Sequence, residues 1–129
     1  MPWTTANGVS IHYKSEGTGG PAAIFLHEIG GSLDSWDGVV PGWANRMQVF
    51  RYDQRGFGLS EKVRAQYSIE TLVDDLESLI GGLALPAPYH IVSLAASSMQ
   101  ALEFYKRAPD KVARSEEHTS ELQSLRHLV

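Results

Sequence analysis

The stretch that decides the predicted fold is His90-Ile91-Val92-Ser93-Leu94-Ala95-Ala96-Ser97-Ser98-Met99-Gln100-Ala101-Leu102-Glu103-Phe104. It begins with a short apolar run, residues 90–94, which is typical of a buried strand. Small residues follow, and from about residue 97 to residue 108 the pattern indicates a helix that Pro109 ends. The stretch therefore predicts a strand that enters a helix through a sharp turn.

The same order of strand and helix recurs earlier in the chain. Residues 22–26 and 47–52 are apolar runs that indicate buried strands, and helices are expected over 33–46 and 68–80. Repeated strand–helix units of this kind predict an α/β fold with a mostly parallel sheet and crossover helices. Residues 3–16 instead predict an antiparallel N-terminal hairpin, because Asn7-Gly8 is a strong signal for a tight turn.

Charged and polar side chains in these elements are predicted to face solvent. His12 alternates with the apolar positions of its strand, so we interpret it as a surface histidine. Ser68 is a candidate N-cap of the helix at 68–80. Asp74 and Asp75 lie off the apolar stripe of that helix and diverge from each other around its axis, which favours a solvated face over acid–base or metal chemistry.

Three loops should carry any binding site. Ligands in parallel sheets bind at the carboxyl ends of the strands. The loops that follow the apolar strands are 27–32, 53–60 and 94–98, and we expect them to meet at one edge of the sheet.

These loops together resemble the α/β-hydrolase-fold family. His27-Glu28-Ile29-Gly30-Gly31 is similar to the family's His-Gly-x-Gly-Gly oxyanion turn, with Glu28 in place of the first glycine. Asp53-Gln54-Arg55-Gly56-Phe57-Gly58-Leu59-Ser60 matches the family's Asp-x-Arg-Gly-x-Gly-x-Ser loop completely. The resemblance covers residues 9 to about 113 and implies a truncated α/β-hydrolase fold.

The resemblance also fixes the register of the nucleophile elbow, whose pattern is Gly-x-Ser-x-Gly. The five positions become Ser93-Leu94-Ala95-Ala96-Ser97, so the catalytic serine site is Ala95 and the nucleophile is absent. By the same resemblance, the backbone N–H groups of Ile29 and Ala96 would face the oxyanion. His27 and Gly30 would lie at the substrate, although a hydrogen bond that holds the loop is the favoured role of His27.

Two alternatives could supply a catalytic group at a position other than 95. Ser93, Ser97 or Ser98 could replace the missing nucleophile, but each needs a base in reach, and the last two suit helix capping. Glu28 could act as an acid or base if burial raised its pKa, whereas a solvated glutamate is the usual case.

The end of the chain changes character. Residues 114–124 resemble the translation of a common sequencing-library adapter, and the strand that should begin at 111–113 is followed by polar residues. We therefore predict a partial hydrolase domain over 1–113 and a non-native tail over 114–129. His118 and His127 are accordingly not assigned catalytic roles, and the family's acid and histidine would lie beyond the break.

Composition narrows the remaining possibilities. The chain of 129 residues has no cysteine and a formal net charge of -4, which excludes thiolate chemistry and gives no basic patch for nucleic acid. The apolar runs and the N-terminus predict neither a membrane span nor a signal peptide, so a cytoplasmic location is expected. No cofactor or metal is predicted. We expect the parent protein to be a hydrolase that acts on a small ester, lactone or amide, and we expect this chain itself to be inactive. The alternative is a non-catalytic protein of this fold that binds a ligand or a partner.

Overall fold

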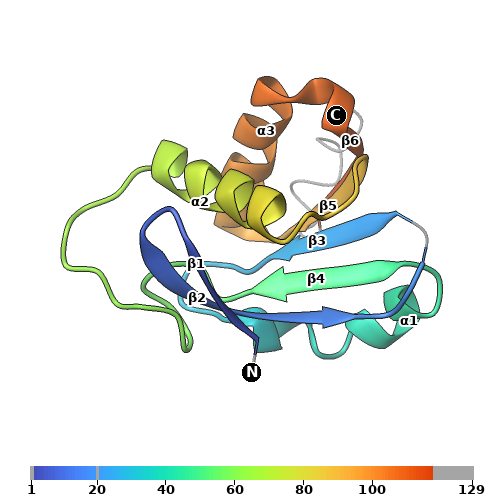
Figure 1. Ribbon diagram of the computed structural model, residues 1–129, viewed down its shortest axis with the longest axis horizontal. Coiled ribbons are helices and arrows are strands. Elements are labelled where there is room, and N and C mark those ends of the chain that lie inside the picture. Colours follow the sequence, from blue (N-terminus) through green and yellow to red (C-terminus); the bar gives the residue numbers. More distant parts are fainter. Residues whose placement is uncertain (1, 20, 118–129) are drawn as a thin grey trace.

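A computed structural model describes residues 2–19 and 21–117, and Figure 1 shows their arrangement. Helices and strands alternate after an N-terminal hairpin. Their bounds are β1 (Trp3–Ala6), β2 (Val9–Glu16), β3 (Ala22–Leu26), η1 (Leu33–Trp36), α1 (Val40–Ala44), β4 (Gln48–Tyr52), α2 (Ile69–Gly82), β5 (Tyr89–Ser93), η2 (Ala95–Ser97), α3 (Ser98–Arg107), η3 (Pro109–Lys111) and β6 (Val112–Glu117).

The strands form one sheet in the order β1-β2-β4-β3-β5-β6. β2 pairs antiparallel with both β1 and β4, whereas the pairs β4–β3, β3–β5 and β5–β6 are parallel. The mostly parallel sheet with an antiparallel N-terminal hairpin is thus confirmed. Asn7 and Gly8 have φ angles of 50° and 81°, which suits the two central residues of a tight hairpin turn.

Hydrophobic cores cover both faces of the sheet, as the continuous apolar run of β3 predicts. Ile24 and Leu26 pack with residues of α2 and α3 on one face, and Ala23 and Phe25 pack with η1 and α1 on the other. In Figure 1, α2 and α3 accordingly lie together above the sheet, and α1 lies below it.

The expected helix over 33–46 is instead two short helices, η1 and α1, separated by a turn. Pro41 explains the division, because proline lacks a backbone N–H and is tolerated only in the first turn of a helix, where it lies in α1. Ser68 caps α2 as predicted, since its hydroxyl accepts from the N–H of Thr71 at 3.2 Å.

The last described strand crosses the predicted domain boundary at residue 113. β6 extends over Val112–Glu117 and pairs in parallel with β5. Backbone hydrogen bonds to the open edge of β5 do not depend on side-chain type, so polar residues form the strand too. The boundary at 113 stays a prediction, and the rest of the predicted tail, with His118 and His127, lies outside the described residues.

No helix among residues 2–19 and 21–117 has the length and hydrophobicity that a membrane crossing requires.

Candidate active site

A pocket of about 410 Å³ lies at the carboxyl ends of the parallel strands. Its walls come from the loops after β3 and β4, from η2 and α3 after β5, and from the segment that enters α2. The lining residues are His27, Glu28, Ile29, Gln54, Phe57, Tyr67, Ser68, Ile69, Leu72, Ala96 and Gln100. The three loops singled out in the sequence therefore meet at one site.

Ala95 occupies a strained position between β5 and α3. Its φ angle is +53°, a left-handed conformation that residues with a Cβ atom rarely adopt. A strained strand-to-helix turn of this kind is what presents the nucleophile in an elbow. Ala95 is exposed, and its methyl group therefore stands at the tip of an elbow without an oxygen to attack a substrate.

The neighbouring serines are used to build the elbow. The hydroxyl of Ser97 accepts from the N–H of Leu94 at 2.8 Å and lies 2.9 Å from the carbonyl oxygen of Leu26, at the end of β3. The hydroxyl of Ser98 donates to the carbonyl oxygen of Ala95 at 2.8 Å, and Ser93 is fully buried in β5. None of the three lines the pocket, so the structure does not support a substitute serine nucleophile.

His27 holds two loops together through both of its ring nitrogens. Nε2 accepts from the N–H of Gln54 at 2.9 Å, so Nδ1 carries the proton and donates to the carbonyl oxygen of Glu28 at 2.7 Å. Burial lowers the pKa of His27 below 6.5, although the bond to the Glu28 carbonyl opposes this shift. The ring is therefore neutral, and both of its nitrogens are already hydrogen-bonded, which favours a structural role of His27 over a catalytic one.

The turn over residues 28–31 shapes the wall beside His27. The N–H of Gly31 donates to the carbonyl oxygen of Glu28 at 3.0 Å, and Gly30 has a φ of +86° at the position where such turns need glycine. A Cβ atom on Gly31 would collide with the Glu28 carboxylate, which folds back over this glycine. Ile29 stays 74% exposed and lines the same pocket as Ala96 of the elbow loop.

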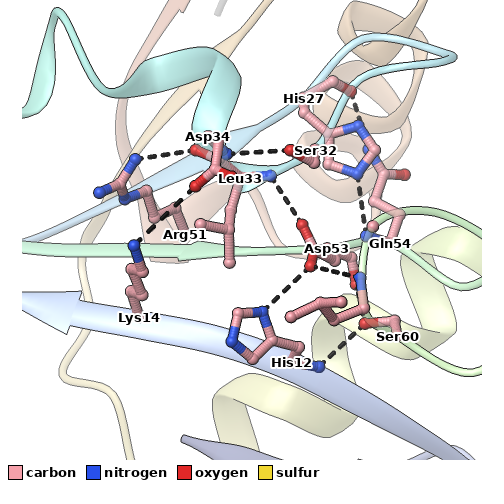
Figure 2. Close-up of polar contacts among 12 residues, drawn as sticks. His12, Lys14, His27, Ser32, Leu33, Asp34, Arg51, Asp53, Gln54 and Ser60 are labelled. Carbon is pink, nitrogen blue, oxygen red and sulfur yellow. Dashed lines mark hydrogen bonds and ion pairs between the residues drawn. The ribbon is translucent and has the colours of Figure 1, made fainter.

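Asp53 organises the loop after β4 through several hydrogen bonds. Its carboxylate accepts from the N–H of Leu33 at 2.7 Å (Figure 2). It also accepts from the N–H of Leu59 at 2.9 Å. It also lies 3.0 Å from Nδ1 of His12. One buried carboxylate thus ties this loop to η1 and to β2.

His12 is not on the surface, so that prediction is wrong. Only 8% of it is exposed, because the chain after β4 runs back along β2 and covers it. The N–H of Asp53 donates to the carbonyl oxygen of His12, and the hydroxyl of Ser60 accepts from the His12 N–H, both at 2.9 Å. An alternating pattern along one strand cannot show that a later loop covers its polar face.

Asp75 is likewise buried, whereas a solvated face was predicted for it. Its two carboxylate oxygens accept from Nε and Nη2 of Arg55, each at 2.7 Å, and one also accepts from the side-chain amide of Asn7 at 2.9 Å. These hydrogen bonds raise the pKa of Arg55 above its ordinary value. The arginine of the loop motif pairs with a helix residue, which is why the carboxylate tolerates burial.

Comparison with known proteins agrees with this architecture. A sequence model of the alpha/beta hydrolase fold matches residues 21–117, three quarters of the chain and all three loops. The chain belongs to the α/β-hydrolase fold family. Among curated proteins it is 36% identical over 112 residues to the probable oxidoreductase EphD of Mycobacterium tuberculosis, covering 83% of this chain and 19% of that protein.

Two further relatives are hydrolases by name. A pimeloyl-[acyl-carrier protein] methyl ester esterase of Methylococcus capsulatus is 34% identical over 94 residues, covering 73% of this chain and 35% of the esterase. The crystal structure of the enol-lactonase of Burkholderia xenovorans LB400 superposes with a TM-score of 0.84 at 27% identity, covering 88% of this chain and 45% of that one. The chain thus spans less than half the length of these relatives.

Within the α/β-hydrolase fold, the predicted site residues separate into two groups. His27, Glu28, Ile29 and Ala96 line the pocket, whereas Gly30 shapes the backbone turn and does not line it. Ala95 adjoins the pocket through Ala96.

Sequence reasoning missed two glutamines of this hydrolase pocket. Gln54 stands at a variable position of its motif, yet its N–H binds His27 Nε2 and its side-chain amide donates to the His27 carbonyl oxygen at 2.9 Å. Gln100 stands on α3 and is 4% exposed, with its side-chain oxygen buried in the pocket wall. The signal for Gln100 was available: five residues after the elbow tip, it is a polar residue on the buried face of α3, where Ala101 and Phe104 also pack.

Proposed function

We propose that the protein to which this chain corresponds is an α/β hydrolase of a small ester, lactone or amide, and that the chain itself does not turn substrate over. The observation that carries the proposal is an elbow with the strained backbone of a nucleophile site, beside a formed pocket, with alanine at its tip. The substrate class is supported by the names of relatives that act on a methyl ester and an enol lactone.

The pocket offers the electrostatic half of the family's mechanism. In that mechanism a nucleophile attacks a carbonyl carbon, and backbone N–H groups stabilise the negative oxygen that forms. The N–H groups of Ile29 and Ala96 are the donors that we assign to this oxygen, because the two residues line the same pocket from the oxyanion turn and the elbow.

The nucleophilic half is missing among the described residues. The titratable side chains that line the pocket are His27, Glu28 and Tyr67. Both ring nitrogens of His27 are already bonded, so it has no free nitrogen to accept a proton from a nucleophile. Glu28 is the carboxyl in the wall, and we assign to it any displaced acid–base step of the intact protein.

Turnover by the purified chain tests the inactivity. With para-nitrophenyl acetate and a γ-lactone as substrates, we expect neither the wild type nor Ala95→Ser to exceed the background rate, because the serine would have no base in reach. Saturable turnover by the wild-type chain would refute the proposal.

A second candidate function is a non-catalytic ligand-binding protein of the same fold, and the alanine at position 95 favours it. Turnover by the full-length protein separates the two. A hydrolase is expected to turn over the ester or lactone, with a pH–rate profile that changes in Glu28→Gln but not in Glu103→Gln, a carboxyl outside the pocket. A full-length protein that binds these compounds without converting them supports the second candidate.

A further inference from the structure

Gln100 brings an unpaired acceptor to the pocket. It lies on the first turn of α3 facing inward, and it is 96% buried, since its exposed fraction is 4%. Its side-chain oxygen is shielded from solvent and has no hydrogen-bond partner among the described residues. Buried polar atoms normally have a partner, and leaving one unpaired is costly.

Glu28 brings a second acceptor to the same pocket. Its Oε1 atom is also shielded and has no hydrogen-bond partner among the described residues. The carboxylate comes from the loop after β3, whereas Gln100 comes from α3, so the two acceptors belong to different walls.

The other polar groups in the wall are engaged elsewhere. The side-chain amide of Gln54 donates to the His27 carbonyl oxygen, and the Ser68 hydroxyl caps α2. The Tyr67 hydroxyl donates to the Arg55 carbonyl oxygen at 3.4 Å, and both ring nitrogens of His27 are bonded. No lysine or arginine is among the lining residues, and the remaining ones are apolar: Ile29, Phe57, Ile69, Leu72 and Ala96. The pocket thus combines an apolar interior with two acceptors and a negative charge that no cation in its wall offsets.

We propose that Gln100 and Glu28 make this pocket selective for small, mainly apolar compounds that carry a neutral O–H or N–H donor, and that they disfavour carboxylates. An apolar ligand would leave the Gln100 oxygen unpaired, whereas a donor on the ligand would supply the missing hydrogen bond. A ligand carboxylate would be repelled by the Glu28 carboxylate in the same pocket. The inference rests on the proposed function only in taking this pocket as the place where substrate binds.

Four compounds of nearly equal size probe this selectivity: para-methylbenzyl alcohol, para-ethyltoluene, para-methylacetophenone and para-toluate. Binding to the purified chain is measured by titration, and backbone amide chemical shifts locate the site. We expect the alcohol to bind about tenfold more tightly than ethyltoluene or the ketone, and toluate to bind most weakly.

Substitutions assign the effect to the two residues. Gln100→Met keeps the volume and should reduce the preference for the alcohol to within about twofold. Glu28→Gln should restore binding of toluate. Gln48→Met and Glu103→Gln are matched controls outside the pocket and should leave all four affinities unchanged.

Equal affinity of the wild type for the alcohol and ethyltoluene, tighter binding of the ketone or of toluate, or no binding of any probe would each overturn the inference. None of these readouts requires turnover, and they use the wild-type chain even if a variant fails to fold. Failure of the hydrolase proposal would appear separately, as full-length protein that binds but does not convert an ester or lactone.

Discussion

Gln54 binds His27 at two points, through its backbone N–H to Nε2 and through its side-chain amide to the His27 carbonyl oxygen, each at 2.9 Å. Figure 2 shows both contacts between the loops after β3 and β4. The first bond requires an unprotonated Nε2. The neutral histidine is therefore part of what keeps the oxyanion turn beside the pocket.

This arrangement predicts a specific pH dependence of stability. Burial lowers the folded-state pKa of His27 below the ordinary 6.5, so the unfolded state takes up a proton first as the pH falls. The contribution of His27 to stability is complete above pH 6.5 and is lost as the pH falls through the lowered pKa. Urea unfolding should show that the difference in unfolding free energy between wild type and His27→Gln is larger at about pH 7.5 than at about pH 5.

A change of pH affects the stability of the whole protein, which is why the comparison with His27→Gln is needed. A difference between the two proteins that does not change with pH would show that the charge state of His27 has no part in holding the loops.

A buried ion pair joins α2 to the loop after β4. We therefore expect that substituting the carboxylate in this pair lowers stability much more than substituting the neighbouring carboxylate. Asp75→Asn leaves Arg55 without its charged partner in a largely buried site and should lower the free energy of unfolding by about 3 kcal/mol. Asp74→Asn removes an exposed partner of Arg107 and should cost less than about 1 kcal/mol. Urea denaturation measures both, and similar losses in the two variants would contradict the assignment.

Two buried tyrosines give a matched test of hydrogen-bond satisfaction. The hydroxyl of Tyr52 has no hydrogen-bond partner among the described residues, and burial together with the nearby charge of Asp75 raises its pKa far above the ordinary value. The hydroxyl of Tyr89 instead donates to the Leu85 carbonyl oxygen at 2.9 Å. Tyr52→Phe should leave stability unchanged or raise it, whereas Tyr89→Phe should lower it by about 1 kcal/mol.

Thermal or urea unfolding of the two variants provides this comparison. A larger loss in Tyr52→Phe than in Tyr89→Phe would mean that the Tyr52 hydroxyl has a partner.

Sequence patterns predicted the elbow and the loops because these features depend on local geometry. The family resemblance implied the register that placed Ala95 at the elbow tip, and its φ of +53° agrees with that position. The apolar run of β3 predicted a strand buried on both faces, which follows from packing helices on each side of a sheet.

The errors came from contacts between segments far apart in the chain. His12 and Asp75 lie 41 and 20 residues from their partners, Asp53 and Arg55, and each is polar in its own element. Periodicity assigns such residues to solvent because it carries no information about which loop returns to cover them. Gln100 is a different case, because its place on the face of α3 that also carries Ala101 and Phe104 was a local signal of burial that sequence reasoning overlooked.

The central claim is that Ala95 stands at the open tip of the elbow while the serines on either side are buried. The chain contains no cysteine, so a single introduced thiol can be followed without interference. Ala95→Cys, Ser93→Cys and Ser97→Cys would each be treated with iodoacetamide under native conditions, and alkylation would be timed by mass spectrometry, with circular dichroism as the check on folding.

We predict rapid alkylation at position 95, where the residue is exposed, and strong protection at positions 93 and 97, which are 0% and 1% exposed. Faster labelling at 93 or 97 than at 95 in folded protein would contradict the register, and with it the assignment of an elbow that lacks its nucleophile.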